Sequence, residues 1–286
     1  MSRRKVRELL EWGRATLKPS GSSSDAALLM AAAADAVSGK GVGHEKVRII
    51  SSNSSDLLDE RAIDIYESYI MKRARHEPAA YIIGVKEFMG INFLVDGRVL
   101  IPRPDTETLV EEASAFIIGK GKSTLLDICT GSGCIAISLR LMCKCLKYAA
   151  ASDLSLGALE AAKRNAQLNG ASINFFQGDL FEGSIGTFDV ITANPPYIPT
   201  SAIGSLPPNV KLYEPLNALD GGEDGLGFYR RIAAHAKSRL NKGGGMFLEI
   251  GFDQGEAVLD LLRGEGFKAH IKKDLSNLDR VACAFV

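Results

Sequence analysis

Four consecutive residues, Asn194-Pro-Pro-Tyr197, have the composition of a site that could hold a planar amino group. They follow an apolar stretch that is typical of a buried strand. Two adjacent prolines remove two amide donors and stiffen the turn, which leaves their carbonyls and the Asn194 side chain free to accept hydrogen bonds. A planar NH2 group held in this fork would turn its nitrogen toward an incoming methyl group, and Tyr197 could stack on its plane. The alternative is an ordinary proline turn, but the combination with asparagine and an aromatic residue favours a site.

A glycine-rich segment, Asp127-Ile-Cys-Thr-Gly-Ser-Gly133, leads from another predicted strand into a predicted helix. Gly131 and Gly133 let the backbone turn sharply and approach a ligand that side chains would exclude. Asp153 ends the next strand, about 20 residues further on, where a carboxylate can accept hydrogen bonds from ribose hydroxyls. Together with Ala136, these residues also satisfy the dinucleotide fingerprint, so this segment alone does not choose the cofactor.

A third strand leads to Gln177-Gly-Asp179-Leu180, which places an acidic and an apolar residue at the carboxyl edge of the sheet. Open α/β sheets bind ligands at that edge. Asp179 could accept a hydrogen bond from an adenine amine while Leu180 packs on the ring. On local sequence alone, a role of Asp179 as a helix or turn cap is equally consistent.

These segments belong to a strand–helix alternation that begins near residue 123. Parallel strands need crossover connections, so the alternation predicts a parallel sheet covered on both faces. The last two strands are joined only by a short polar segment and should therefore pair antiparallel. The predicted strands are residues 124–128, 148–152, 173–176, 188–192, 245–250, 268–271 and 281–285, and the predicted helices are 135–142, 155–168, 228–240 and 255–262.

The first 80 residues have a different pattern, with apolar residues at helical spacing. They carry 13 lysines and arginines against 11 acidic residues, so they are no basic nucleic-acid arm. In the following segment, β-prone residues flank Asp96-Gly97 and predict a hairpin that turns there. Prolines 102 and 104 end any strand, and Asp105 is expected to cap the next helix.

The composition is that of an ordinary globular protein. Of 286 residues, 46% are apolar and 24% charged, which excludes collagen-like, coiled-coil and wholly disordered chains. Basic and acidic side chains balance at 34 each, which argues against nonspecific binding to a phosphate backbone. The five cysteines predict neither a disulfide framework nor a metal site. No apolar run approaches the ~20 residues that span a bilayer, so no membrane partner is expected.

Several motifs together resemble the HemK/PrmC family of peptide-chain-release-factor glutamine methyltransferases. Asn194-Pro-Pro-Tyr197 is similar to the motif of S-adenosylmethionine-dependent methyltransferases that act on planar amino or amide nitrogens. The discriminating segment is Ile101-Pro-Arg-Pro-Asp-Thr-Glu107, because many nucleic-acid methyltransferases share the first motif and lack this one. The resemblance extends over essentially the whole chain, and its other motifs are Glu87-Phe88, Tyr213-Glu-Pro215, Ala218-Leu219, Gly221-Gly222 and Asp279-Arg-Val281.

The resemblance implies an α/β fold: a seven-stranded class I, Rossmann-like methyltransferase sheet with the last strand antiparallel, plus a small N-terminal helical domain. It divides the chain into a release-factor-docking helical domain (1–80), a β-hairpin linker (81–104) and a methyltransferase domain (105–286). The implied reaction moves a methyl group from S-adenosyl-L-methionine, leaving S-adenosyl-L-homocysteine, to the glutamine amide nitrogen in the Gly-Gly-Gln loop of class I peptide chain release factors. We also expect a cytoplasmic monomer, with an organelle left open as its compartment, and no stable nucleic-acid binding.

Motif matching assigns the site residues. The substrate amide is expected at Asn194, Pro195, Pro196 and Tyr197, and the cofactor at Cys129, Thr130, Gly131, Ser132, Gly133, Asp153, Asp179, Leu180 and Asn194. Two positions depart from the family pattern: Cys129 stands where glycine is usual, and Leu180 replaces an aromatic residue found in some members. A side chain at position 129 is expected to crowd the cofactor or to demand an ordinary backbone angle.

Two rival functions are compatible with the motifs. One is a DNA or RNA methyltransferase, because the exocyclic amine of a flipped base fits the same fork. The zero net charge and the lack of a basic, aromatic-rich segment argue against it. The other is a cofactor-binding module without catalysis, which the unusual Cys129 would favour.

Overall fold

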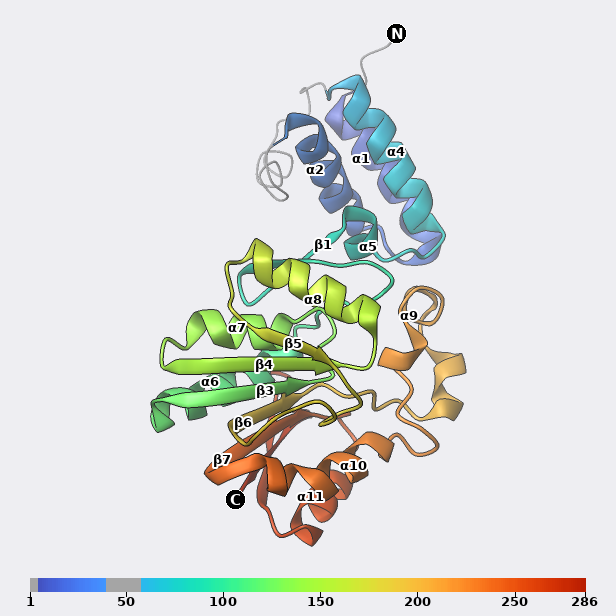
Figure 1. Ribbon diagram of the computed structural model, residues 1–286. Coiled ribbons are helices and arrows are strands. Elements are labelled where there is room, and N and C mark those ends of the chain that lie inside the picture. The colour runs from blue at the N-terminus through green and yellow to red at the C-terminus, as the bar shows by residue number, and fades with distance from the viewer. Residues whose placement is uncertain (1–4, 40–57) are drawn as a thin grey trace. The chain divides into compact units, whose positions relative to one another are not determined.

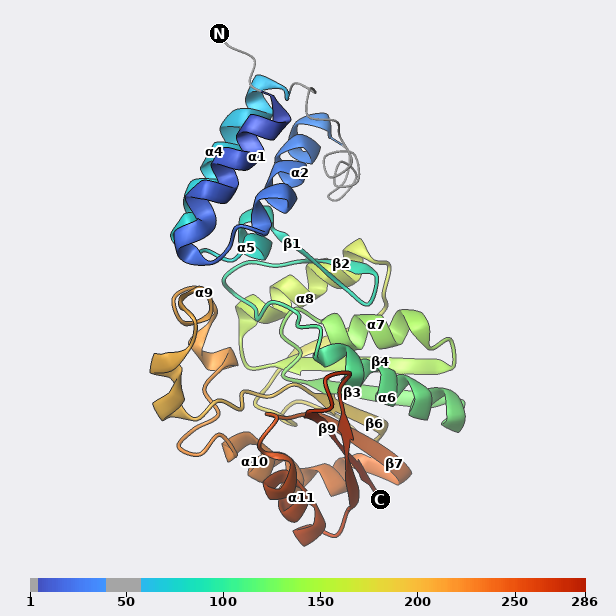
Figure 2. The ribbon, with the colours of Figure 1, turned by 180° about the vertical axis from the view of Figure 1, so that it is seen from behind.

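The computed structural model describes residues 5–39 and 58–286. The chain forms two compact units: residues 1–85 with 207–213, and residues 86–206 with 214–286. Figures 1 and 2 show their elements from opposite sides. Within the described ranges, no helix is long and apolar enough to cross a membrane.

The first unit is helical, as predicted. Its core is packed closely: the hydroxyl of buried Tyr66 donates to the Leu9 carbonyl at 3.3 Å, and a Cβ on Gly13 would lie 2.0 Å from that hydroxyl. The unit also takes in the segment up to Tyr213, whose hydroxyl donates to the Arg75 carbonyl at 2.7 Å. Its elements are α1 (Val6–Leu17), a 3-10 turn (Lys18–Ser20), α2 (Asp25–Ser38), α4 (Glu60–Ala74), α5 (Ala79–Ile83) and α9 (Pro208–Lys211).

The second unit is built on a seven-stranded sheet of order β5-β4-β3-β6-β7-β9-β8. The five strands from β5 to β7 are parallel, and β9 runs antiparallel to both β7 and β8. The predicted fold class is therefore confirmed. The strands are β3 (Ser123–Ile128), β4 (Leu146–Asp153), β5 (Asn174–Gln177), β6 (Phe188–Ala193), β7 (Leu240–Glu249), β8 (Lys268–Lys273) and β9 (Asp279–Phe285).

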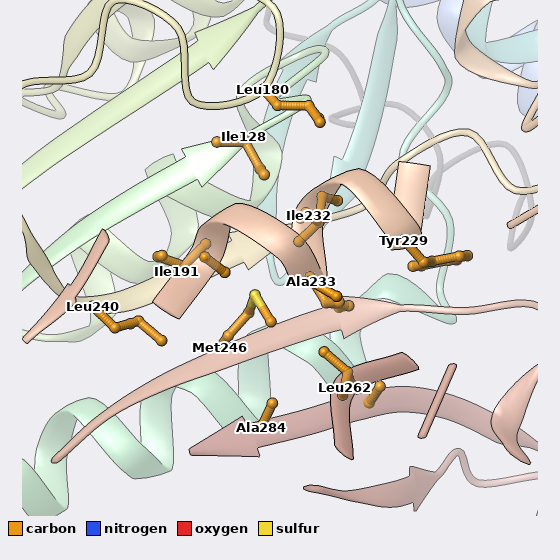
Figure 3. Packing of buried hydrophobic residues seen from close by; sticks show 14 of the residues in the cluster. Ile128, Leu180, Ile191, Tyr229, Ile232, Ala233, Leu240, Met246, Leu262 and Ala284 are labelled. Atoms are coloured by element: carbon orange, nitrogen blue, oxygen red, sulfur yellow. The ribbon is translucent and has the colours of Figure 1, made fainter. Parts of the chain in front are cut away.

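Helices cover both faces of this sheet (Figures 1 and 2). On one face lie α6 (Thr106–Lys120), α7 (Cys134–Met142) and α8 (Leu156–Leu168), and on the other lie α10 (Gly227–Ala236), its 3-10 extension (Lys237–Arg239) and α11 (Gly255–Gly264). Figure 3 shows Ile191 and Met246 of the sheet packed against Ile232 of α10 and Leu262 of α11. Because helices cover both faces of the sheet, β3 and β6 are buried at nearly every position rather than at alternate ones.

Two local predictions are wrong. The hairpin of β1 (Val85–Phe88) and β2 (Ile91–Leu94) turns at Met89-Gly90, whose φ angles of +51° and +72° suit a type I′ turn. Asp96-Gly97 forms a separate turn after the hairpin, closed by a 3.1 Å bond from the Val99 amide to the Asp96 carbonyl. Asp105 stands at the N-cap of α6 but makes no capping bond with its side chain, which lies 3.3 Å from Arg280 instead.

Candidate active site

A cavity lies within the second unit, at the carboxyl ends of β3, β4, β5 and β6. Parallel strands all end at one edge, so the loops that follow them meet there. The lining includes these predicted site residues: Cys129, Thr130, Gly131, Ser132, Asp153, Asp179, Leu180, Asn194 and Pro196. The other three, Gly133, Pro195 and Tyr197, are not among the lining residues.

Asp127 anchors the glycine-rich loop from beneath. Its carboxylate is fully buried and accepts hydrogen bonds from the hydroxyls of Thr130, at 2.6 Å, and Thr192 of β6, at 2.7 Å. Burial raises the pKa of Asp127 to about 7, against the opposing effect of these bonds. The Gly133 amide donates to the Thr130 carbonyl at 2.8 Å, which closes the turn. The loop is therefore fixed before any ligand arrives.

Gly131 and Asp153 form the part of the site that suits a ribose. Gly131 has a φ of +55°, and a Cβ there would point into open space. The Asp153 carboxylate accepts from the Gly131 amide at 2.8 Å and from the Ser155 amide at 2.9 Å, while burial raises its pKa. Each carboxylate oxygen has a further lone pair, so two ribose hydroxyls can still donate to it. These residues fit a nucleoside cofactor.

Cys129 and Leu180 both hold left-handed backbone angles, with φ of +56° and +54°. The expectation that a side chain at 129 demands an ordinary angle is wrong: the cysteine keeps the angle that glycine would adopt at lower cost. Burial raises the pKa of the Cys129 thiol, which disfavours its thiolate form. The carbonyl of Leu180 accepts from the Ser152 hydroxyl at 3.1 Å, which fixes this second loop to β4.

Gly133 lies where α7 packs against α8. A Cβ there would lie 3.0 Å from Ile137 and 3.2 Å from Ala162 of α8. Nearby, the buried Asn165 side chain donates to the Ser132 carbonyl at 2.9 Å and exchanges hydrogen bonds with the backbone of Leu94. Sequence reasoning missed Asn165, although an asparagine on the apolar face of a predicted helix is a signal for such a tie.

The Asn194-Pro-Pro-Tyr197 turn is held by residues far away in the sequence. The Asn194 side-chain nitrogen donates to the Thr106 hydroxyl at 3.3 Å, and the Tyr197 hydroxyl donates to Glu249 at 3.5 Å. The Tyr197 carbonyl accepts from the Gln254 side chain at 2.9 Å. The tyrosine ring packs against the core cluster of α10 and α11, and burial raises its pKa.

Glycines of the segment before α10 lie against this turn. A Cβ on Gly225 would lie 2.4 Å from the Tyr197 carbonyl oxygen, and one on Gly221 would lie 2.7 Å from the Tyr197 Cα. The segment includes 3-10 turns at Thr200–Ser205 and Leu216–Ala218, and it contributes Asn217, Ala218 and Asp220 to the cavity lining.

Charged pairs border the cavity on two sides. Arg103 forms an ion pair with the buried carboxylate of Glu214, which also accepts from the Ile101 amide at 3.4 Å. On the other side, Arg231 of α10 lies 2.7 Å from Asp179. Its guanidinium stands 5.8 Å from the ring centre of Phe228, another lining residue that sequence reasoning missed. Leu180 and Phe228 give this end an apolar surface beside an acidic one.

Two family models match the chain: a methyltransferase small domain over residues 106–204 and a PrmC N-terminal domain over residues 8–84. Among similar proteins is a release factor glutamine methyltransferase from Geobacter sulfurreducens, 39% identical over 96% of this chain and 95% of its own. A protein of the same name from Bacillus subtilis is 33% identical over 98% of this chain and 97% of its own.

Solved structures share the fold. A methyltransferase from Pyrococcus furiosus superposes with a TM-score of 0.54 at 21% identity, covering 70% of this chain and 91% of that one. The hMettl16 catalytic domain, crystallised with an RNA hairpin, gives 0.57 at 17% identity, covering 82% of this chain and 85% of that one. At these identities the likeness concerns architecture and leaves the substrate class to the site and the sequence relatives.

Proposed function

The chain belongs to the release factor glutamine methyltransferase family, and on that premise we propose that it methylates the glutamine side-chain amide in the Gly-Gly-Gln motif of class I release factors. The observation that carries the proposal is the extent of the relationship. The two relatives of that name described above match 95% or more of both chains, and a domain model of the family matches residues 8–84 of the helical first unit. The cavity and the Asn194 turn then supply a site suited to an amide.

The methyl donor we propose is S-adenosylmethionine, which supplies an electrophilic methyl group on a sulfonium centre. Asp153 would bind the ribose hydroxyls, and the loop from Cys129 to Gly133 would border the ribose and methionine. Leu180 and Phe228 would pack on the adenine. The Asp179 oxygen that Arg231 does not hold would accept from the adenine amine.

The chain contributes to the reaction mainly by positioning. An amide nitrogen is a poor nucleophile because its lone pair is delocalised into the carbonyl. The Asn194 side-chain oxygen and the Pro195 carbonyl would accept the two amide hydrogens and orient the nitrogen in line with the methyl group. Accepting those hydrogens also stabilises the positive charge that develops on nitrogen, more in the transition state than before it. The proton then passes to water, since an N-alkylated amide cation is strongly acidic.

The first 80 residues, in this proposal, dock the release factor, and the hairpin segment 81–104 links them to the methyltransferase domain in a monomeric, cytoplasmic enzyme. Support comes from the match of this part of the chain to a domain model of the family. The packing of residues 207–213 with the helical unit is also consistent with it, because this segment follows the Asn194 motif along the chain.

A methyl-transfer assay with labelled S-adenosylmethionine tests the function. The acceptors are a class I release factor, the same factor with its Gly-Gly-Gln glutamine changed to alanine, and total nucleic acid. We expect label on the intact factor alone, mapped to that glutamine by mass spectrometry. Label on nucleic acid would instead support the base-amine methyltransferase, and cofactor binding without transfer would support the non-catalytic module.

A further inference from the structure

Glu249 is a buried carboxylate behind the Asn194 turn, and the mechanism above does not use it. It ends β7 and is 1% exposed. One oxygen accepts from the Tyr197 hydroxyl, while the other, Oε2, has no partner at hydrogen-bonding geometry among the residues that the structure describes. Thr106 and Asn194 nevertheless lie close enough to favour its charged form through hydrogen bonding. A buried carboxylate oxygen that has no hydrogen-bond partner, although Thr106 and Asn194 lie close by, needs a physical explanation.

Asn194 can face the cavity in two ways, because its amide oxygen and nitrogen exchange places on a half-turn. The neighbours behind it decide between them. Thr106 is 2% exposed and accepts from the Asn194 nitrogen at 3.3 Å. Its own hydroxyl hydrogen is then free to rotate toward Glu249, and a carboxylate can only accept. Both neighbours therefore favour the amide nitrogen on their side.

We propose that Glu249, acting with Thr106, is a positioning residue that holds the Asn194 amide with its nitrogen toward the sheet and its oxygen toward the cavity. This inference rests on the proposed function, because only an NH2-bearing substrate needs an acceptor there. With the amide reversed, its NH2 group would oppose the NH2 group of the substrate, and its oxygen would face a carboxylate. The reversed state would bind the cofactor and fail to orient the glutamine.

The charge on Glu249 should make this device depend on pH. Burial raises the pKa of Glu249 to about 7. Above that pH the carboxylate is an acceptor and fixes the amide; below it, the protonated acid can also donate, so the preference weakens. The charge of nearby Arg280 is shared with Asp105 at 3.3 Å and Asp274 at 3.1 Å. The titratable or charged groups that act on or are affected by Glu249 are Asp105, Cys134, Tyr197, Tyr229 and Arg280.

The test measures kcat on a release factor and cofactor affinity by calorimetry for the wild type and the variants E249A, E249Q and T106V. E249A and T106V should lower kcat by about tenfold or more, since misorientation alone costs that much, and leave the cofactor Kd within about threefold. E249Q, which like the protonated acid can donate as well as accept, should show at pH 8 the several-fold lower kcat that the wild type shows at pH 6. T108V, on the same helix outside the cavity lining, is the matched control and should match the wild type.

The pH profile separates positioning from simple structural support. Wild-type kcat should fall several-fold between pH 8 and pH 6, and E249Q should lack that fall. A wild-type kcat in T106V, an unchanged acid limb in E249Q, or a loss confined to cofactor affinity would overturn the inference. If E249A does not fold, T106V against T106S decides the question in its place. Failure of the wild type to methylate the glutamine would refute the proposed function instead.

Discussion

The glycine-rich loop after β3 and the Asn194-Pro-Pro-Tyr197 turn after β6 line one cavity, yet they draw on different contacts. Apart from the bond between Thr192 and Asp127, 65 residues apart, the loop takes its shape from Asp127 and Thr130, three residues apart, and from Asp153, 22 residues after Gly131. The turn depends on Thr106, Glu249 and Gln254, which lie 88, 52 and 57 residues from the groups that they bind. In the proposed function, a largely local structure therefore serves the cofactor, and a structure assembled from distant segments serves the substrate. The two should fail separately.

The N194A variant is expected to show the largest difference between loss of kcat and loss of cofactor affinity. Removing the side-chain acceptor should lower kcat by about 10² to 10³, as for other groups that stabilise transition-state charge. Cofactor Kd should change little, because Asp153 and the glycine loop are untouched. Steady-state transfer to a release factor and calorimetry with the cofactor measure the two quantities, with N174A on exposed β5 as the control. Equal loss of turnover and cofactor binding would show that the glycine-rich loop and the Asn194 turn act as one unit.

A displaced turn should have the next largest effect. In G225A the new methyl would lie 2.4 Å from the Tyr197 carbonyl oxygen, and the residue has a φ of +75°. We expect a fall in kcat of about tenfold to a hundredfold with cofactor Kd retained. G222A is the matched variant, because its φ is +91° but nothing lies within 4 Å of its Cβ. G222A has the same kind of backbone strain as G225A but no steric clash. A similar kcat for both variants would therefore show that the close packing of Gly225 on Tyr197 does not position the turn.

The D153A variant tests the glycine-rich loop and its proposed role in cofactor binding. Loss of a carboxylate that supports Gly131 and, in the proposed function, binds the ribose should raise the cofactor Kd about tenfold to a hundredfold, the range for hydrogen bonds to charged groups. At saturating cofactor, kcat should stay within about threefold of the wild type. Calorimetry and a cofactor titration of the transfer rate give both values, with D260A on the exposed face of α11 as the control. A loss of kcat that saturating cofactor does not restore would contradict the division of roles between the glycine-rich loop and the Asn194 turn.

The smallest effect is expected at Cys129. C129G relieves a left-handed backbone angle but also removes a partly buried side chain, whereas C129A removes the sulfur and keeps the strain. The difference between the two variants isolates the backbone contribution, and we expect C129G to unfold with a free energy about 1 kcal/mol higher than C129A. Urea denaturation followed by circular dichroism measures it. Equal stability would mean that the loop holds this angle without cost.

The same contrast explains what could be predicted from the sequence. The strands, and the residues at their ends that could bind ligands, can be predicted because each strand is a local apolar run. The antiparallel final pair can be predicted because the connection between its strands is too short for a crossover. The hairpin turn was misplaced because Asp-Gly is the stronger local signal, while Met89 adopts its positive φ under the constraint of the strands on either side.

The residues that support the Asn194 turn could not be predicted in the same way. Thr106 begins a helix and Glu249 ends a strand, and nothing near either residue in the chain indicates that they meet beside Asn194. Only the sheet order, which places β6 next to β7 and α6 over them, brings the three together. Side chains that bind ligands are thus easier to recognise in a sequence than the side chains that orient them.

The order in which the chain is synthesised gives this division a consequence in time. A ribosome adds roughly 5–20 residues per second, so Glu249 emerges on the order of ten seconds after Gly131. During that interval β3, α7, β4, α8 and then Thr192 of β6 become available to form and anchor the glycine loop, whereas the strand that carries Glu249 does not yet exist. A nascent chain can therefore acquire a nucleoside-binding loop well before it is able to modify the machinery that terminates its own synthesis.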